Sequence, residues 1–296
     1  MKIMIGEPRV VDAGRGAAWW GSGWRLFTSA IWTWIGIMIV YIIISVLINS
    51  VPYVGDVGHA LLTPVFMGGL MIGCQEIERG GRLRVSHLFE GFQGAHFVPL
   101  MIIGAVNIAI VLGIIALAAA GIMGSLKFAD MARMGAAGGD PLGAFFGSVR
   151  AMTGTGLLLT LLVLVVGAVF GMLNWFAPAL VALRGATAVE AMRLSFVSCL
   201  RNWVPFLVYG AIAIAVAIAV AVLVGALALA AGVSAFMNGI SDSRGWMAIA
   251  GIAVLFFAIF AVAALVVGPI VFGSTYGGYK DTLASDDTSL GNPAYH

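Results

Sequence analysis

The chain has 296 residues, of which 61% are hydrophobic and only 9% are charged, and its formal net charge is +2. A soluble domain carries about 25% charged residues, so this composition excludes a fully solvated surface and indicates a lipid bilayer as the solvent. The small net charge gives no indication of binding to nucleic acid.

Six long segments without Asp, Glu, Lys or Arg predict six transmembrane helices, near 28–50, 57–75, 97–122, 154–183, 203–235 and 246–277. A spanning helix needs about 20 apolar residues, which each segment provides or nearly provides. The segments are apolar on all sides and lack the alternation of β-barrel strands, and helices also satisfy their backbone groups in lipid. The predicted fold class is therefore an all-α polytopic membrane protein.

Positive charge is distributed unevenly between the two ends of these segments. Eleven Lys and Arg residues fall in the N-terminal segment, the loops after the second and fourth helices, and the C-terminal tail, whereas four fall in the other loops. Because cytoplasmic loops are enriched in Lys and Arg, we expect both termini in the cytoplasm. The second segment, which contains His59 and Pro64, must span the membrane for this bias to hold.

Short amphipathic stretches precede three of the spans. Thr187 and Glu190 match a capping box, which predicts that a helix starts there. We expect such helices to lie in the headgroup layer with their arginines toward water. Their predicted apolar faces contain Trp20, Trp24, Phe27 and Ile31; then Val85, Leu88, Phe89 and Phe92; then Val189, Met192, Phe196, Leu200 and Trp203.

The chain also repeats its own patterns. "GAHFVPLMIIG" at 94–104 and "LRNWVPFLVYG" at 200–210 enter an apolar segment in the same way, with Val-Pro in the predicted first turn, where proline costs no hydrogen bond. A second pattern follows three prolines at fixed offsets: Pro64 with Gly68, Gly73 and Glu76; Pro269 with Gly273, Gly278 and Asp281; and, in part, Pro178 with Ala182 and Glu190.

These patterns predict a threefold helical-hairpin repeat within one transmembrane domain, 1–281. Its units lie near 10–76, 79–183 and 184–281, and each contains an amphipathic helix, a span out and a span back. Residues 282–296 are predicted to be a polar, disordered cytoplasmic tail. Internal repeats are common in transport folds, although a duplicated hairpin does not imply transport.

"TPVFMGGLMIGCQEIERGG" followed by "VSHLFEGF" combines a helix end rich in Pro and Gly, an Arg-Gly pair and an amphipathic stretch. The pattern resembles uncharacterised bacterial six-helix inner-membrane families, including the membrane domain of some glycerophosphodiester phosphodiesterases. The resemblance implies a six-helix fold and a bacterial inner-membrane location. It transfers no catalytic residue, because the sequence contains no soluble phosphodiesterase domain.

Ionisable residues within spans are functional candidates by default, and this chain nearly lacks them. His59 lies near the outer end of the second span, while Asn107 and Asn174 are expected either to bond between helices or to line a substrate path. Pro64, Pro178 and Pro269 are candidate hinges, and Glu76, Glu190 and Asp281 are acids near helix ends. An intramembrane enzyme would need Glu76, Glu78 and Glu190 to converge with His87 or His96.

No spacing of His, Cys or carboxylate residues predicts a metal or cofactor site, and Cys74 and Cys199 are expected to be small buried residues. We therefore expect a non-enzymatic inner-membrane protein that organises membrane lipid or a membrane complex. The alternative is a carrier for a lipid or another hydrophobic small molecule, which a lateral apolar groove would favour. The expected partners are membrane lipids, another membrane protein or a hydrophobic small molecule, and not nucleic acid.

Overall fold

The computed structural model describes residues 7–52, 54–136, 141–237 and 243–284, and within these ranges the chain forms helices and no strands. The helices are, in order, α1 (Arg15–Ser29), α2 (Ile31–Asn49), α3 (Val54–Glu78), the 3-10 helices η1 (Val85–Phe92) and η2 (Gly94–His96), α4 (Phe97–Ala136), α5 (Pro141–Asn174), α6 (Ala177–Arg184), α7 (Ala188–Arg201), α8 (Trp203–Met237) and α9 (Ser243–Leu283). The all-α prediction is confirmed.

Six stretches of the described chain are long and apolar enough to cross a membrane: Ile31–Asn49, Val54–Glu78, Gly94–Ala119, Leu157–Arg184, Trp203–Ala226 and Ala261–Leu283. They coincide with the six predicted spans, including the doubtful second one. Four of the described helices are far longer than a span needs, since α4, α5, α8 and α9 have 40, 34, 35 and 41 residues. A helix rises 1.5 Å per residue, so α4 is about 60 Å long.

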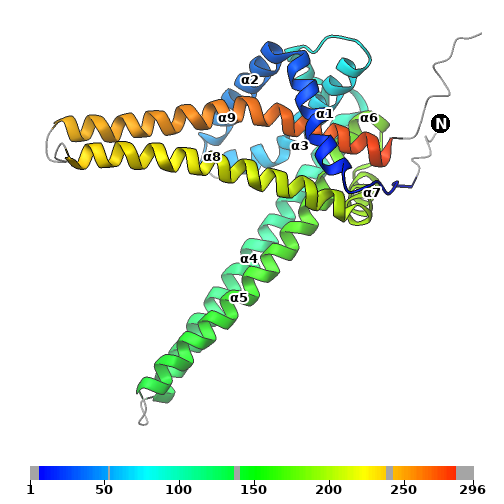
Figure 1. Cartoon of the computed structure of the whole chain (residues 1–296). Coiled ribbons are helices and arrows are strands. Elements are labelled where there is room, and N and C mark those ends of the chain that lie inside the picture. Colours follow the sequence, from blue (N-terminus) through cyan, green and yellow to red (C-terminus); the bar gives the residue numbers. More distant parts are fainter. Residues whose placement is uncertain (1–6, 53, 137–140, 238–242, 285–296) are drawn as a thin grey trace, which may run out of the picture.

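Figure 1 shows two long hairpins, α4–α5 and α8–α9, that extend in different directions from a common junction. The remaining helices α1, α2, α3, α6 and α7 gather at that junction (Figure 1). Each hairpin consists of two antiparallel apolar helices that meet the rest of the chain at one end only (Figure 1). The candidate groove and the charged cavity lie where the α8–α9 hairpin joins the junction.

The fourth predicted span, 154–183, is not one helix. The helix α5 begins at Pro141, ends at Asn174, and is followed after Trp175 and Phe176 by the short helix α6. Proline has no N–H to bond the carbonyl four residues back and its ring clashes with that carbonyl, so Pro178 prevents a continuous helix past Asn174. Pro178 instead lies in the first turn of α6, a position that tolerates it.

Ser195 of α7 bridges this break. Its hydroxyl accepts a hydrogen bond from the N–H of Phe176 at 2.9 Å and donates one to the carbonyl of Met172 at 2.6 Å. Both backbone groups belong to the ends of α5 and α6 that the break leaves without helical partners. The serine is fully buried, so the bridge replaces the missing helical bonds out of contact with solvent.

The amphipathic stretches form helices, and the predicted apolar faces of α1 and α7 contain both buried side chains, such as Phe27 and Met192, and exposed ones. The helix α7 starts where predicted, with Thr187 accepting a bond from the N–H of Glu190. Its buried residues include Ala188, Ala191, Ser195, Ser198 and Cys199, whereas Val189 is 76% exposed and Leu200 is 54% exposed. In α1, Trp19 is buried and Trp24 is 55% exposed.

Small residues therefore make the helix contacts and many large apolar side chains point outward. This is the arrangement expected in a membrane, where lipid solvates large apolar side chains and close approach of helices decides which faces pack. The third stretch, η1, is a 3-10 helix that buries Leu88 and leaves Val85 and Phe89 exposed.

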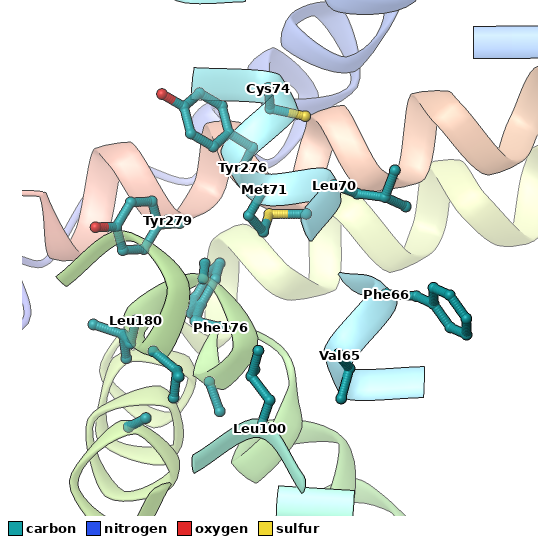
Figure 2. Close-up of a cluster of buried hydrophobic side chains, with 14 of the residues drawn as sticks. Val65, Phe66, Leu70, Met71, Cys74, Leu100, Phe176, Leu180, Tyr276 and Tyr279 are labelled. Carbon is teal, nitrogen blue, oxygen red and sulfur yellow. The ribbon is translucent and has the colours of Figure 1, made fainter. Parts of the chain in front are cut away.

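The core of the junction is built around α3, as Figure 2 shows. The buried side chains of α3 meet others from α4, α6 and α9, together with Phe176 in the break after α5; the labelled members are Val65, Phe66, Leu70, Met71, Cys74, Leu100, Phe176, Leu180, Tyr276 and Tyr279. Gly69 permits a close approach of η1 to α3, because a Cβ there would overlap the carbonyl oxygen of His87.

The order of elements is compatible with the predicted units, each with a short helix before a span out and a span back, and the repeat itself stays a prediction. Pro99 and Pro205 lie in the first turns of α4 and α8, as predicted. The predicted tail begins at 282, but α9 continues to Leu283 and Thr282 is fully buried. The rest of that tail, 285–296, lies outside the described residues.

Candidate functional site

A groove runs along the face of the α8–α9 hairpin near the junction, with a volume of about 810 Å³. On α8 its wall follows a stripe of small residues at every fourth position, Ala213, Ala217, Ala221 and Gly225. Residues four apart lie on one face of a helix, so these small side chains leave space along one face of α8. The α9 wall includes Phe256, Ile259, Ala263, Ala264, Val267, Gly268 and Val271.

Three aromatic residues from three different helices close the end of the groove at the junction. They are Trp20 of α1, Trp175 in the break after α5, and Tyr209 of α8. The Trp20 and Tyr209 rings stack with centroids 5.0 Å apart and planes inclined by 20°, and Trp175 meets Tyr209 edge-on at 5.6 Å. The break caused by Pro178 is thus part of the site, because it places Trp175.

The side-chain polar atoms of Trp20 and Tyr209 are bonded within the protein. The Trp20 indole N–H donates to the Tyr209 carbonyl at 3.2 Å, and the Tyr209 hydroxyl lies 2.8 Å from the Ser274 hydroxyl. None of the described lining residues carries a charge. The groove therefore presents an apolar surface to a ligand. An ionised group placed along it would lose its hydration without gaining a polar partner.

A second apolar pocket, of about 290 Å³, lies on another side of Trp175. Its walls come from the end of α5, from α7 and from the start of α8, and they comprise Ala168, Gly171, Met172, Trp175, Cys199, Trp203, Phe206 and Leu207. Trp175 thus separates two apolar spaces. Phe206 packs edge-on against it at 5.7 Å.

None of the predicted polar and hinge residues of the spans is among the described residues that line the groove. Pro269 is buried in α9, directly after Gly268 of the groove wall. The Asn174 side chain bonds the carbonyl of Phe170 in its own helix at 2.9 Å. The Asn107 Oδ1 is buried and accepts no hydrogen bond from the described residues, and His59 lies with its ring 6.5 Å from the Tyr41 ring. Pro64 is buried within α3.

The predicted acids and histidines have separate surroundings. Asp281 accepts bonds from Arg15 and from the Trp19 indole, the latter at 2.8 Å. Glu190 lies in the first turn of α7, and Glu76 lies near the end of α3. The described residues hold no group of three or more His, Cys, Asp or Glu side chains placed to bind a metal ion.

The histidines named for an acid–base site also bond elsewhere. His87 accepts the N–H of Arg84 at 2.9 Å and lies 3.5 Å from Glu90, while the Nδ1 atom of His96 is 3.2 Å from the Val181 carbonyl. Glu78 accepts the Tyr276 hydroxyl at 2.8 Å. No recorded contact joins these histidines to Glu76, Glu78 or Glu190 in the described part of the chain.

Sequence analysis missed the groove, although its signal is visible. The alternation of Ala with Val and Ile through "GAIAIAVAIAVAVLVGA" at 210–226 places Ala213, Ala217 and Ala221 on one helical face. Trp20 was predicted to be part of an apolar face, and Trp175 lies within the fourth predicted span, 154–183. Their convergence depends on the packing of α1 and on the α5–α6 break, which local sequence patterns do not give.

The chain is similar to a protein of Burkholderia thailandensis that bears the name probable inner membrane protein. The two are 29% identical over 230 residues, which is 76% of this chain and 82% of the relative. This chain is a membrane protein. No family model and no solved structure matches it, so the resemblance to the membrane domain of glycerophosphodiester phosphodiesterases stays a prediction.

Proposed function

We propose that this protein is a non-enzymatic inner-membrane protein that binds a lipid chain or a similar hydrophobic molecule in the α8–α9 groove. The observation that carries the proposal is the groove itself, about 810 Å³ in volume and without a charged lining residue. Ligand sites in proteins have volumes of about 300–1,000 Å³ and are mostly apolar. Of the two functions that the sequence left open, this groove favours the carrier.

The position of the groove supports a ligand taken from the membrane. Its α8 wall runs from Tyr209 to Gly225, and 16 residues of helix at 1.5 Å each give about 24 Å. One leaflet of hydrocarbon is about 15 Å thick, half of the usual core. A groove of this length within two apolar spans fits an extended chain better than a compact solute.

The proposed location rests on the relative and on the charge distribution. The relative is named a probable inner membrane protein, and the eleven-to-four excess of Lys and Arg favours cytoplasmic termini. With this orientation Trp20, Trp175 and Tyr209 lie at the cytoplasmic end of the groove. The polar part of a bound lipid would then lie toward the cytoplasmic leaflet, beyond the aromatic residues.

Native mass spectrometry of the protein, extracted gently from its own membranes, tests this function. We expect a fixed number of one lipid or hydrophobic molecule bound per chain. In the variant Ala217→Phe the added ring occupies the groove, and displacing two methylenes of the ligand at about 0.8 kcal/mol each lowers its affinity about tenfold.

Ala215→Phe is the matched control, because Ala215 is exposed on the same helix and does not line the groove. Loss of the ligand in Ala217→Phe with retention in Ala215→Phe supports the proposal. Equal retention in both variants, or a wild-type protein without any bound molecule, overturns it. A second protein at fixed stoichiometry and no small ligand would instead favour an accessory role in a membrane complex.

A further inference from the structure

A second cavity, of about 450 Å³, lies on another face of α1 and differs from the groove in chemistry. It lies where α1 crosses α9 beside the end of α3, and charged or hydroxyl side chains form much of its wall: Arg15, Ser22, Arg25, Glu78, Tyr276, Lys280 and Asp281. On α1, Trp20 points to the groove while Ser22 and Arg25 line this cavity. The two sites are therefore separate.

Both carboxylates of the cavity already have partners. Asp281 accepts bonds from the guanidinium of Arg15 and the indole of Trp19. Glu78 accepts bonds from the Tyr276 hydroxyl and the Lys280 ammonium. Each acid is thus held by a cation and by one neutral donor, and neither is left to attract a further cation.

Arg25 is the remaining charge. It is exposed on α1, and its side chain forms no ion pair or hydrogen bond with the residues that the structure describes. The cavity wall contains Arg15, Arg25 and Lys280 against Glu78 and Asp281, which leaves one excess positive charge. Ser22, one helical turn before Arg25, adds a hydroxyl on the same face.

The depth of Arg25 points to the headgroup layer. The span of α2 begins at Ile31, six residues after Arg25 and just beyond the break between α1 and α2 at Ala30. Trp24 and Trp32 on either side are exposed, as aromatic residues at a membrane interface are. The spans of α3 and α9 end at Glu78 and Leu283, and residues near both of these ends line the cavity.

We infer that this cavity binds a phosphate group, with the guanidinium of Arg25 as its principal ligand and Ser22 and Lys280 at its edge. A guanidinium offers a planar fork of donors that matches two phosphate oxygens, and one excess positive charge matches a phosphodiester. The chemistry is shared by a phospholipid headgroup and by free phosphate. The site does not depend on the proposed function of the groove.

Binding to the purified full-length protein in detergent tests the inference in two arms. One arm titrates short-chain phosphatidylglycerol and follows the first bound lipid by native mass spectrometry. The other titrates inorganic phosphate and follows heat by calorimetry. In Arg25→Gln we expect the dissociation constant to rise about tenfold or more, because a charge-assisted hydrogen-bond pair is lost.

Arg193→Gln is the matched control, since Arg193 is exposed on α7 and lies outside the cavity; its affinity should stay within about twofold of wild type. Arg25→Lys keeps the charge without the fork and should fall between the two. An Arg25-dependent lipid affinity well above that for phosphate assigns the site to a headgroup, and Arg25-dependent phosphate binding of equal strength assigns it to the free anion.

Equal weakening in Arg25→Gln and Arg193→Gln would indicate unspecific attraction and overturn the inference, as would absence of binding in both arms. Because Arg25 is exposed, its substitution should leave the thermal unfolding midpoint unchanged. Ala217→Phe separates the two proposals, because blocking the groove should not alter binding at this cavity.

Discussion

The crossing of α1 over α9 depends on glycine, and Gly23→Ala is the most direct test of the packing. A Cβ at Gly23 would overlap the carbonyl oxygen of Ile270 and lie 3.0 Å from the N atom of Ser274. These are backbone atoms of α9, so no side-chain rotation can relieve the contact. Gly273 on α9 is equally close, since a Cβ there would lie 2.9 Å from the Cα of Gly23.

The loss of stability expected in Gly23→Ala follows from this geometry. Inserting a methyl group into a packed interface costs about 1–3 kcal/mol, and alanine recovers up to about 1 kcal/mol by its better helix propensity. Gly21→Ala provides the matched control, because Gly21 lies on the same helix and a Cβ there would meet nothing within 4 Å. That variant should gain the propensity without the clash, so the free energies of unfolding of the two variants differ by about 1–3 kcal/mol.

Thermal unfolding of both variants in one detergent, followed by tryptophan fluorescence, measures this difference. About 1 kcal/mol shifts the midpoint of a protein of this size by 2–4 °C, so Gly23→Ala should unfold roughly 2–12 °C below Gly21→Ala. A Gly23→Ala midpoint equal to or above that of Gly21→Ala would refute the close crossing of α1 and α9.

Two further predictions concern α7. Ser195→Ala should destabilise the protein by about 2 kcal/mol, because the buried N–H of Phe176 loses its acceptor. Ser198→Ala should be neutral or stabilising, because the Ser198 hydroxyl is buried without a partner among the described residues. Equal unfolding midpoints of the two variants would contradict the bridge across the α5–α6 break. Burial raises the pKa of the Cys199 thiol to about 12, so alkylation by iodoacetamide at pH 8, measured by mass spectrometry of its peptide, should be roughly a thousandfold slower in the folded protein than in the unfolded one. Since the pKa of the Cys199 thiol is higher in the folded state, its contribution to stability is complete below about pH 8.5 and is lost as pH rises toward 12. Fast labelling at pH 8 would contradict the burial of this thiol.

The parts of the fold that follow from local physics were predictable. Gaps between charges predict the six spans, because each ionised side chain in lipid is costly. Thr187 predicts the start of α7, because a cap is a property of four consecutive residues. Pro178 was recognised as a candidate hinge, but its full consequence, a helix end at Asn174, needs the buried Ser195 that satisfies the freed backbone groups. That serine comes from another helix, 19 residues later in the chain.

The candidate site was less predictable, because its residues matter by being small or by meeting across helices. A search for ionisable or polar side chains within the spans singles out His59, Asn107 and Asn174, yet the described lining of the groove contains none of these. It is made where Ala213, Ala217 and Ala221 leave space that a larger side chain would fill. Such residues look like ordinary packing positions in a sequence, and the same is true of the small buried residues of α7.

The two proposed sites together suggest how one helix can serve both. Trp20 and Arg25 lie on α1, five residues apart, and they face a groove lined by carbon and a cavity lined by charge. Five residues in a helix turn through about 500°, or 140° beyond one full turn, which separates the two side chains without a change in backbone. Gly23 lies between these two residues and brings α1 into close contact with α9, so the helix itself separates the groove from the charged cavity. Double variants at Ala217 and Arg25 test this separation: we expect the two losses of binding energy to be additive, and a non-additive loss would show that the two sites are coupled.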